Sequence, residues 1–158
     1  MFVALIITSK SMLRQQFDAS FEEELEAVGE EMVLRMQEFL RREGKDATGE
    51  LINSIEFEIT RDKTLLFRAT AEHAIYVHEG TRAHWAPPGA LREWVQTVGF
   101  ASGLSIESRD YLARKSIAES GTEATPFIEE PLEERATIIA QGLETRLERD
   151  LQQTANEL

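Results

Sequence analysis

A stripe of apolar residues in the first third of the chain restricts the possible fold more than any other feature. Steps of three and four separate its members, which are Phe21, Leu25, Val28, Met32, Met36 and Phe39. This spacing is typical of an amphipathic α-helix with one face on a core. Ser20 and Glu23 match a capping box, which predicts the start of the helix. Gly44 supplies a stop, so we predict a helix over residues 20–43.

A second long stripe lies near the C-terminus. Its members are Leu132, Ala136, Ile139, Leu143, Leu147 and Leu151. Thr125 is a suitable cap, and Pro126 fits the first helical position, where its missing N–H costs nothing. We therefore predict a second long helix over residues 125–155.

Between these helices the apolar pattern changes to alternation. Ile55, Phe57 and Ile59 alternate with polar residues, and so do Leu65, Phe67 and Ala69 after a polar turn at residues 61–63. Two such runs around a short turn predict an antiparallel hairpin. We predict a third strand over Ala74–His78, ending at Gly80, which gives a sheet region over residues 50–80. We predict that residues 1–19 form an N-terminal arm or edge strand, with a loosely ordered terminus as the alternative.

Two shorter helices are expected before the last one. Leu91, Trp94, Val95 and Val98 follow a Pro-Pro-Gly break at helical spacing, with Gly99 as the C-cap. A further helix should span Ile106–Glu119 and close at Gly121. Residues 88–121 are thus a helical insert. The expected fold class is α+β in a single domain over residues 1–158: two long amphipathic helices packed on a small, mainly antiparallel β-sheet, with two shorter helices inserted.

Composition limits the function. The 158 residues carry a formal net charge of -12, with a calculated pI near 4.7. Such a surface repels nucleic acid, because phosphate binding needs clustered Lys and Arg. The acids concentrate on the first helix, on the face opposite the stripe, where such residues are usually solvated: Glu22, Glu23, Glu24, Glu26, Glu30 and Glu31. The chain has no cysteine, which excludes disulfides and thiolate metal sites.

The histidines and serines do not form a recognisable catalytic pattern. His73 and His78 would point to opposite faces of one strand, so they could not share a metal ion. His78-Glu79 lacks the second histidine of a zinc-protease motif, and no Gly-x-Ser-x-Gly elbow or phosphate-binding loop is present. We therefore predict no catalytic residue, metal site or cofactor. Trp94 is expected in the core, and Trp85, in a Pro-rich loop, is expected to be an interface anchor or a lid over the core.

Three segments resemble one known family. They are Thr48–Ile55 (TGELINSI), Ala74–Thr81 (AIYVHEGT) and Ala124–Leu132 (ATPFIEEPL), with a similar Pro-Pro-Gly-Ala-Leu-Arg-Glu-Trp stretch before the last. In order and separation they resemble the head–tail joining, or tail-completion, family of tailed bacteriophages. Two departures are His78 before Glu79, where the family often has the acid directly after the valine, and Ala124-Thr125 in place of a basic residue.

The resemblance implies a non-enzymatic virion protein. It implies a ring of copies of this chain, six-fold or twelve-fold, in the neck or upper tail that joins the DNA-filled head to the tail. Its partners would be itself and neighbouring connector and tail proteins, with DNA as passing cargo and no membrane. Assembly would take place in the host bacterial cytoplasm.

Candidate residues follow from this resemblance. The subunit-interface candidates are Tyr76, His78, Glu79, Gly80, Thr81, Trp85, Pro126 and Phe127. Glu22, Glu23 and Glu26 are candidates to face the channel, where like charge would keep DNA from adhering. Adaptor, stopper, tail-terminator and tail-completion rings stay open. The alternatives are a small cytosolic adaptor that binds a helical partner without forming rings, and a hydrolase with a His78/Glu79 site.

Overall fold

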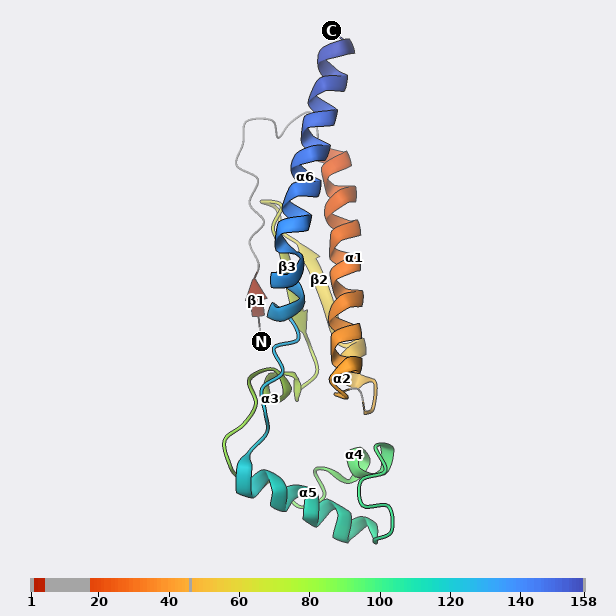
Figure 1. The fold of residues 1–158 in the computed structure, drawn as a ribbon, viewed down its shortest axis with the longest axis vertical. Coiled ribbons are helices and arrows are strands. Elements are labelled where there is room, and N and C mark those ends of the chain that lie inside the picture. The colour runs from red at the N-terminus through yellow and green to blue at the C-terminus, as the bar shows by residue number, and fades with distance from the viewer. Residues whose placement is uncertain (1, 5–17, 46, 158) are drawn as a thin grey trace.

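The structure is a computed structural model that describes residues 2–4, 18–45 and 47–157. Its elements are β1 (Phe2–Ala4), α1 (Asp18–Arg42), α2 (Glu50–Asn53), β2 (Ile55–Ile59), β3 (Leu65–Ala69), α3 (Ala74–Glu79), α4 (Arg92–Thr97), α5 (Ile106–Ser120) and α6 (Glu129–Glu157). The α+β expectation is confirmed. The molecule is elongated: α1 and α6 run antiparallel along the long axis, and α4 and α5 form a separate helical insert at one end (Figure 1).

Helix α1 has the predicted apolar stripe but not the predicted start. Leu25, Met32 and Met36 are fully buried. The helix begins at Asp18, so Ser20 lies within it and the predicted capping position is wrong. The C-terminal end matches the prediction, because the N–H groups of Gly44 and Lys45 donate to the carbonyls of Arg41 and Leu40. These two bonds are the Schellman pattern that satisfies the last carbonyls of a helix.

The sheet has three antiparallel strands in the order β1-β3-β2. The predicted hairpin is confirmed: Phe57 pairs with Phe67, and Ile59 pairs with Leu65 beside the turn. The N-terminal edge strand is confirmed for residues 2–4, since Val3 pairs with Phe67 from the other side. The rest of the predicted arm, apart from residues 18 and 19 in α1, lies outside the described residues.

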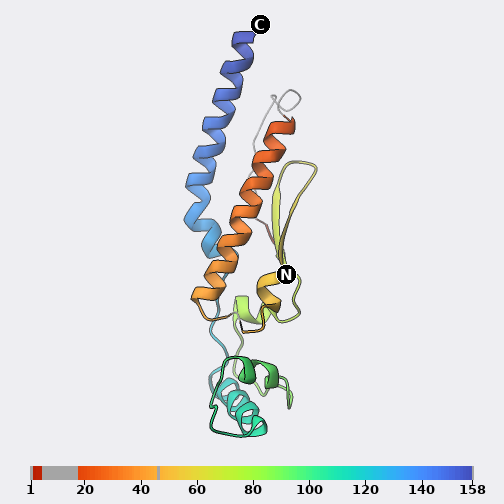
Figure 2. The same ribbon diagram turned by 90° about the vertical axis from the view of Figure 1, so that its right-hand side faces the viewer.

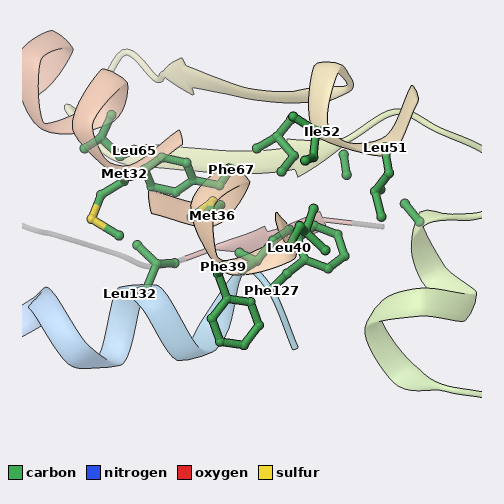
Figure 3. Packing of buried hydrophobic residues seen from close by; sticks show 14 of the residues in the cluster. Met32, Met36, Phe39, Leu40, Leu51, Ile52, Leu65, Phe67, Phe127 and Leu132 are labelled. Carbon is green, nitrogen blue, oxygen red and sulfur yellow. The ribbon is translucent and has the colours of Figure 1, made fainter. Parts of the chain in front are cut away.

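One helix position explains how closely α1 approaches the sheet. Gly29 lies under the ring of Phe57, and a Cβ atom at residue 29 would be 2.4 Å from the Phe57 Cε2. Real Cβ atoms do not come so near, so only glycine lets the ring lie against the helix. Figure 3 shows the core that this packing closes, with Met32, Met36, Phe39, Leu40, Leu51, Ile52, Leu65, Phe67, Phe127 and Leu132.

The third predicted strand is wrong, because Ala74–Glu79 is the helix α3. Ala74 and His78 are its buried residues, and Tyr76 is exposed to solvent. Positions four apart share one face of a helix, whereas on a strand Tyr76 would share the face of Ala74 and His78. The region 50–80 therefore has two strands flanked by α2 and α3, rather than three strands.

Helix α6 begins at Glu129 rather than at Thr125. Thr125 is buried, its N–H donates to the carbonyl of Val77 at 2.9 Å, and it lies four residues before the helix. Pro126 is therefore not the first helical residue, and the prediction for this end is wrong. Leu132, Ile139 and Leu143 are buried as predicted. The side chains of Leu147 and Leu151 lie outside the described residues.

The two helices of the insert occur where the sequence predicts them. Helix α4 ends just before Gly99, and α5 ends at Ser120 with Gly121 after it. Helix α5 lies across the long axis of the molecule, below the ends of α1 and α6 (Figures 1 and 2).

Candidate functional site

The chain divides into a body, formed by α1, α2, the sheet, α3 and α6, and the insert between Thr81 and Thr122, which starts before the predicted residue 88. The three segments that carry the family resemblance meet at the end of the body that faces the insert. Segment Ala74–Thr81 forms α3, and its Val77 carbonyl accepts the Thr125 N–H of segment Ala124–Leu132. Segment Thr48–Ile55 forms α2, whose Leu51 and Ile52 are buried in the same cluster as Phe127 (Figure 3). Residues far apart in sequence thus build one junction.

His78 lies inside this junction. Its side chain is buried, its Nε2 is 2.6 Å from Glu129 Oε2, and its ring meets Phe127 edge-on with centroids 5.1 Å apart. Glu129 is in the first turn of α6, where a carboxylate interacts well with the helix dipole. The contact joins α3 to the first turn of α6, with the imidazole buried and the Glu129 side chain 37% exposed. His78 and Phe127 therefore serve the chain's own core, whereas Tyr76 and Glu79 of the interface candidates lie on the exposed side of α3.

A single β-bridge between Thr81 and Thr122, here called the Thr81–Thr122 bridge, connects the junction to the insert. Thr81 and Thr122 exchange backbone hydrogen bonds of 3.0 and 3.1 Å, and their hydroxyls are 3.0 Å apart. Gly80 and Gly121 flank this bridge with φ of 68° and 74°. A Cβ on Gly121 would lie 2.0 Å from the Thr81 carbonyl oxygen, and one on Gly80 would lie 2.5 Å from that of Thr122. Two glycines are required for the strands to come this close.

The insert is organised around Asp110, which is 3% exposed. Its carboxylate accepts hydrogen bonds from the N–H groups of Gly89 at 3.0 Å and Leu91 at 3.1 Å, and from Arg114 Nε at 2.8 Å. Burial alone would raise the pKa of Asp110, but the two backbone donors and Arg114 hold that pKa below its ordinary value. Arg109 similarly ties the chain together by donating to the carbonyls of Phe100 and Val95.

Large apolar side chains of the insert remain at its surface. They are Trp85, Trp94, Val98, Leu104, Tyr111 and Leu112. Trp85 lies beside Tyr111 with ring centroids 6.1 Å apart, and Trp94 lies beside Phe100 at 5.8 Å. The prediction of Trp94 as a core residue is wrong, because Val95 fills the small core instead. A shallow open depression of about 460 Å³ is lined by Leu104, Glu107, Ser108, Tyr111 and Leu112.

The acidic face of α1 divides into two parts. Glu23 and Glu26 are exposed, and Glu22, also exposed, pairs with Lys63 of the hairpin turn. Glu24 and Glu31 are half-buried and turn toward α6 instead of lying on a freely solvated face.

The pairing partners of these two carboxylates hold α1 and α6 together. Glu31 contacts Arg135 of α6 at 2.5 Å and Arg35 at 2.8 Å, while Glu24 contacts Arg146 of α6 at 3.2 Å. Hydrogen bonds from Arg135 and then Arg35 lower the pKa of Glu31. The channel-facing candidates are in the first turns of α1, and this end of the helix is the one remote from the insert (Figure 1).

Sequence reasoning missed three residues that organise these regions: Asp110, Glu129 and Arg135. Asp110 had a signal, since Arg114 follows at the i+4 spacing of a helical ion pair. Glu129 and Arg135 had none, because their partners His78 and Glu31 are distant in sequence.

The described residues were also searched for metal sites, and the chain was compared with known proteins. Over residues 2–4, 18–45 and 47–157, no group of three or more His, Asp or Glu side chains could hold a metal ion. Within the same ranges, no helix combines the length and apolar character needed to cross a membrane. Comparison with protein-family models, curated proteins and solved structures found no match.

Proposed function

We propose that this chain is a structural subunit of a ring in the neck or upper tail of a tailed bacteriophage, where it joins the DNA-filled head to the tail. The main observation behind the proposal is the convergence of the three family-like segments. Thr48–Ile55, Ala74–Thr81 and Ala124–Leu132 occur in the family's order and meet at one buried junction. Three short matches that also pack together support a shared scaffold better than three isolated ones.

The division of the molecule into two chemically unlike parts also supports this function. A ring closes through heterologous contacts, in which one surface of a subunit meets a different surface of the next. The helical insert offers exposed aromatic residues, while the body offers acidic helix faces. Copies arranged side by side would therefore have two distinct surfaces for such a contact.

The acidic end of α1 suits a wall along which DNA passes. Glu23 and Glu26 have no ion-pair partner among the described residues, so they present uncompensated charge. Carboxylates repel phosphates, and a passing duplex would not adhere to such a wall. We propose that this end of α1, with Glu22, faces the channel.

Deletion of the gene from the phage genome, followed by negative-stain electron microscopy of the lysate, tests the joining role. We expect filled heads beside separate, complete tails, with joined particles restored by the wild-type chain supplied from a plasmid. Normal joined particles without the chain would refute the proposal and favour the cytosolic adaptor.

The channel assignment has its own test. Reversal of Glu23 and Glu26 to Lys should slow genome ejection from assembled particles, because the wall would then attract DNA. Glu22 is left unchanged so that its pair with Lys63 is preserved. The matched control reverses Glu130 and Glu133, two exposed glutamates with the same spacing at the start of α6, which lies at the other end of that helix from Arg146 and its partner Glu24. Equal ejection kinetics in all three particles would refute the channel assignment.

A further inference from the structure

The insert makes its polar contacts within itself. Asp110 pairs with Arg114 and accepts hydrogen bonds from two backbone N–H groups that precede α4. Arg109 of α5 donates to the carbonyl of Val95 in α4 and to that of Phe100 just after this helix. These bonds tie α4 and α5 to each other, so the insert keeps its shape without help from the body.

The core of the body ends before the insert begins. Its apolar cluster, together with the partly buried residues packed against it, is confined to residues 21–77 and 127–143. Two views show the insert beyond the end of the body, reached by the two chain segments that meet at the Thr81–Thr122 bridge (Figures 1 and 2). Two units without a large apolar interface move relative to each other by default. The orientation of the insert therefore depends on these two connecting segments.

Backbone hydrogen bonds hold the connecting segments side by side at three levels. On the body side, the Thr125 N–H donates to the Val77 carbonyl at 2.9 Å. On the insert side, the His84 N–H donates to the Ile117 carbonyl at 3.3 Å, and the Thr81–Thr122 bridge lies between these two bonds. Sliding one segment past the other would break the bonds, whereas bending both segments out of their common plane keeps them. The connection therefore favours one direction of motion.

Gly80 and Gly121 lie on opposite sides of the bridge, one on each connecting segment. Gly80 comes just before Thr81, on the body side, with φ 68° and ψ -177°. Gly121 comes just before Thr122, on the insert side, with φ 74° and ψ -159°. This backbone region is essentially restricted to glycine, which also has the widest range of accessible φ and ψ. Each segment thus has one point at which the backbone rotates at low cost.

We propose that the insert swings as a rigid unit about a hinge formed by Gly80, the Thr81–Thr122 bridge and Gly121. The swing is out of the plane of the two connecting segments, the direction that preserves their hydrogen bonds. It changes the angle between α5 and the long axis of the body and carries the exposed aromatic residues of the insert with it. In the proposed ring, the hinge would let the insert fit a neighbouring connector or tail protein while the body stays in place. The hinge belongs to the single chain, so the inference stands apart from the ring function.

Distances between pairs of spin labels measure the swing, and a chain without cysteine accepts labels only at introduced cysteines. Glu38→Cys on α1 and Ser116→Cys on α5 form the pair across the hinge. Glu38→Cys with Gln141→Cys on α6 is the control within the body. Glu93→Cys with Ser116→Cys is the control within the insert, and all four positions are exposed. Dilution with unlabelled chain removes distances between copies. The distance distribution across the hinge should be about twice as wide as that of either control.

A matched pair of alanine variants tests whether the glycine beside the bridge sets the angle of the insert. Gly121→Ala places a Cβ 2.0 Å from the Thr81 carbonyl oxygen, so the bridge must open and the mean distance across the hinge should shift. Gly99→Ala has a similar φ of 67° with nothing within 4 Å, so it should leave this distance unchanged. Circular dichroism checks that both variants are folded.

Two results would overturn the inference: a distance distribution across the hinge as narrow as both controls, or an unshifted mean distance in a folded Gly121→Ala variant. The gene-deletion experiment is independent of these measurements. Normal joined particles without the chain would refute the ring function and leave the hinge of the free chain standing. A narrow distribution, combined with separate heads and tails in the deletion lysate, would reject the hinge alone.

Discussion

The body and the insert of this chain are stabilised by different means. The body has a continuous apolar cluster that draws on α1, α2, the sheet, α3, the first half of α6 and the two residues before α6. The insert buries few apolar side chains and is held by polar bonds, chiefly from Asp110 and Arg109 to backbone groups. A small unit can therefore keep its shape through buried polar bonds while its large apolar side chains stay available at the surface.

The most severe destabilisation is expected in the body. Phe127→Ala removes a fully buried ring at the meeting point of α3 and α6 and leaves a cavity, which should lower the free energy of unfolding by about 4 kcal/mol. Denaturant unfolding followed by circular dichroism measures this loss. Val98→Ala, which shortens an exposed side chain in the insert, is the control and should change stability little. An equal loss of unfolding free energy in both variants would show that the apolar side chains of the body contribute no more to stability than those at the surface of the insert.

A smaller and more local effect is expected in the insert. Asp110→Ala leaves Arg114 and the N–H groups of Gly89 and Leu91 without their shared acceptor, at a cost of about 3 kcal/mol. Because the apolar cluster contains no insert residue, hydrogen exchange should accelerate in α4 and α5 but not in α1 or the hairpin. Uniform acceleration over the whole chain would show that the two regions unfold together.

The next largest loss of stability is expected at the Thr81–Thr122 bridge. Gly121→Ala puts a Cβ against the Thr81 carbonyl at a backbone conformation that favours glycine, so we expect a cost of about 2 kcal/mol. Amide hydrogen exchange measures this cost, and the Thr81 and Thr122 amides of the variant should exchange faster than those of the wild type. Gly99→Ala has a similar φ of 67° but open space around it, so it isolates the cost of conformation from that of the clash. A Gly121 variant no less stable than the Gly99 variant would show that the close approach is dispensable.

The weakest of these effects concerns pH. The pKa of Asp110 is below its ordinary value of 3.8 in the folded chain, so its contribution to stability is fully present above that value. The contribution is lost as the pH falls through the lowered pKa. Acid titration followed by tryptophan fluorescence should therefore show a transition in the insert, which has both Trp85 and Trp94. Asp110→Asn should remove this part of the pH dependence, and its persistence would assign the transition to another carboxyl group.

Elements whose apolar pattern fits one periodicity were predictable from the sequence, and α3 was not. The stripe of α1 repeats over many turns, and the alternation of β2 is repeated in β3 across a short turn. Ala74–Glu79 has no such repeat, and its Ile, Tyr and Val favour a strand when taken alone. Burial of Ala74 and His78 on one helical face overrides that preference, and only tertiary contacts with Phe127 and Glu129 reveal it.

The candidate site was predictable to a similar degree. The three family-like segments could be found from sequence, but their meeting at one junction depends on how α2, α3 and α6 pack. The exposure of Trp94 could not be foreseen, because its helical stripe also contains Leu91, Val95 and Val98 and only one of them is fully buried. Periodicity predicts which face of a helix is apolar, but not which apolar residue the neighbouring element covers.

The Thr81–Thr122 bridge has a consequence for the evolution of this chain. Entry to and exit from the insert lie side by side, because Thr81 and Thr122 are hydrogen-bonded neighbours. A short turn could therefore replace everything between them without moving either end, and a longer or different segment could be grafted there equally well. The helical unit is in this sense a cassette, and the contacts that it makes can diversify while the framework that carries it stays the same.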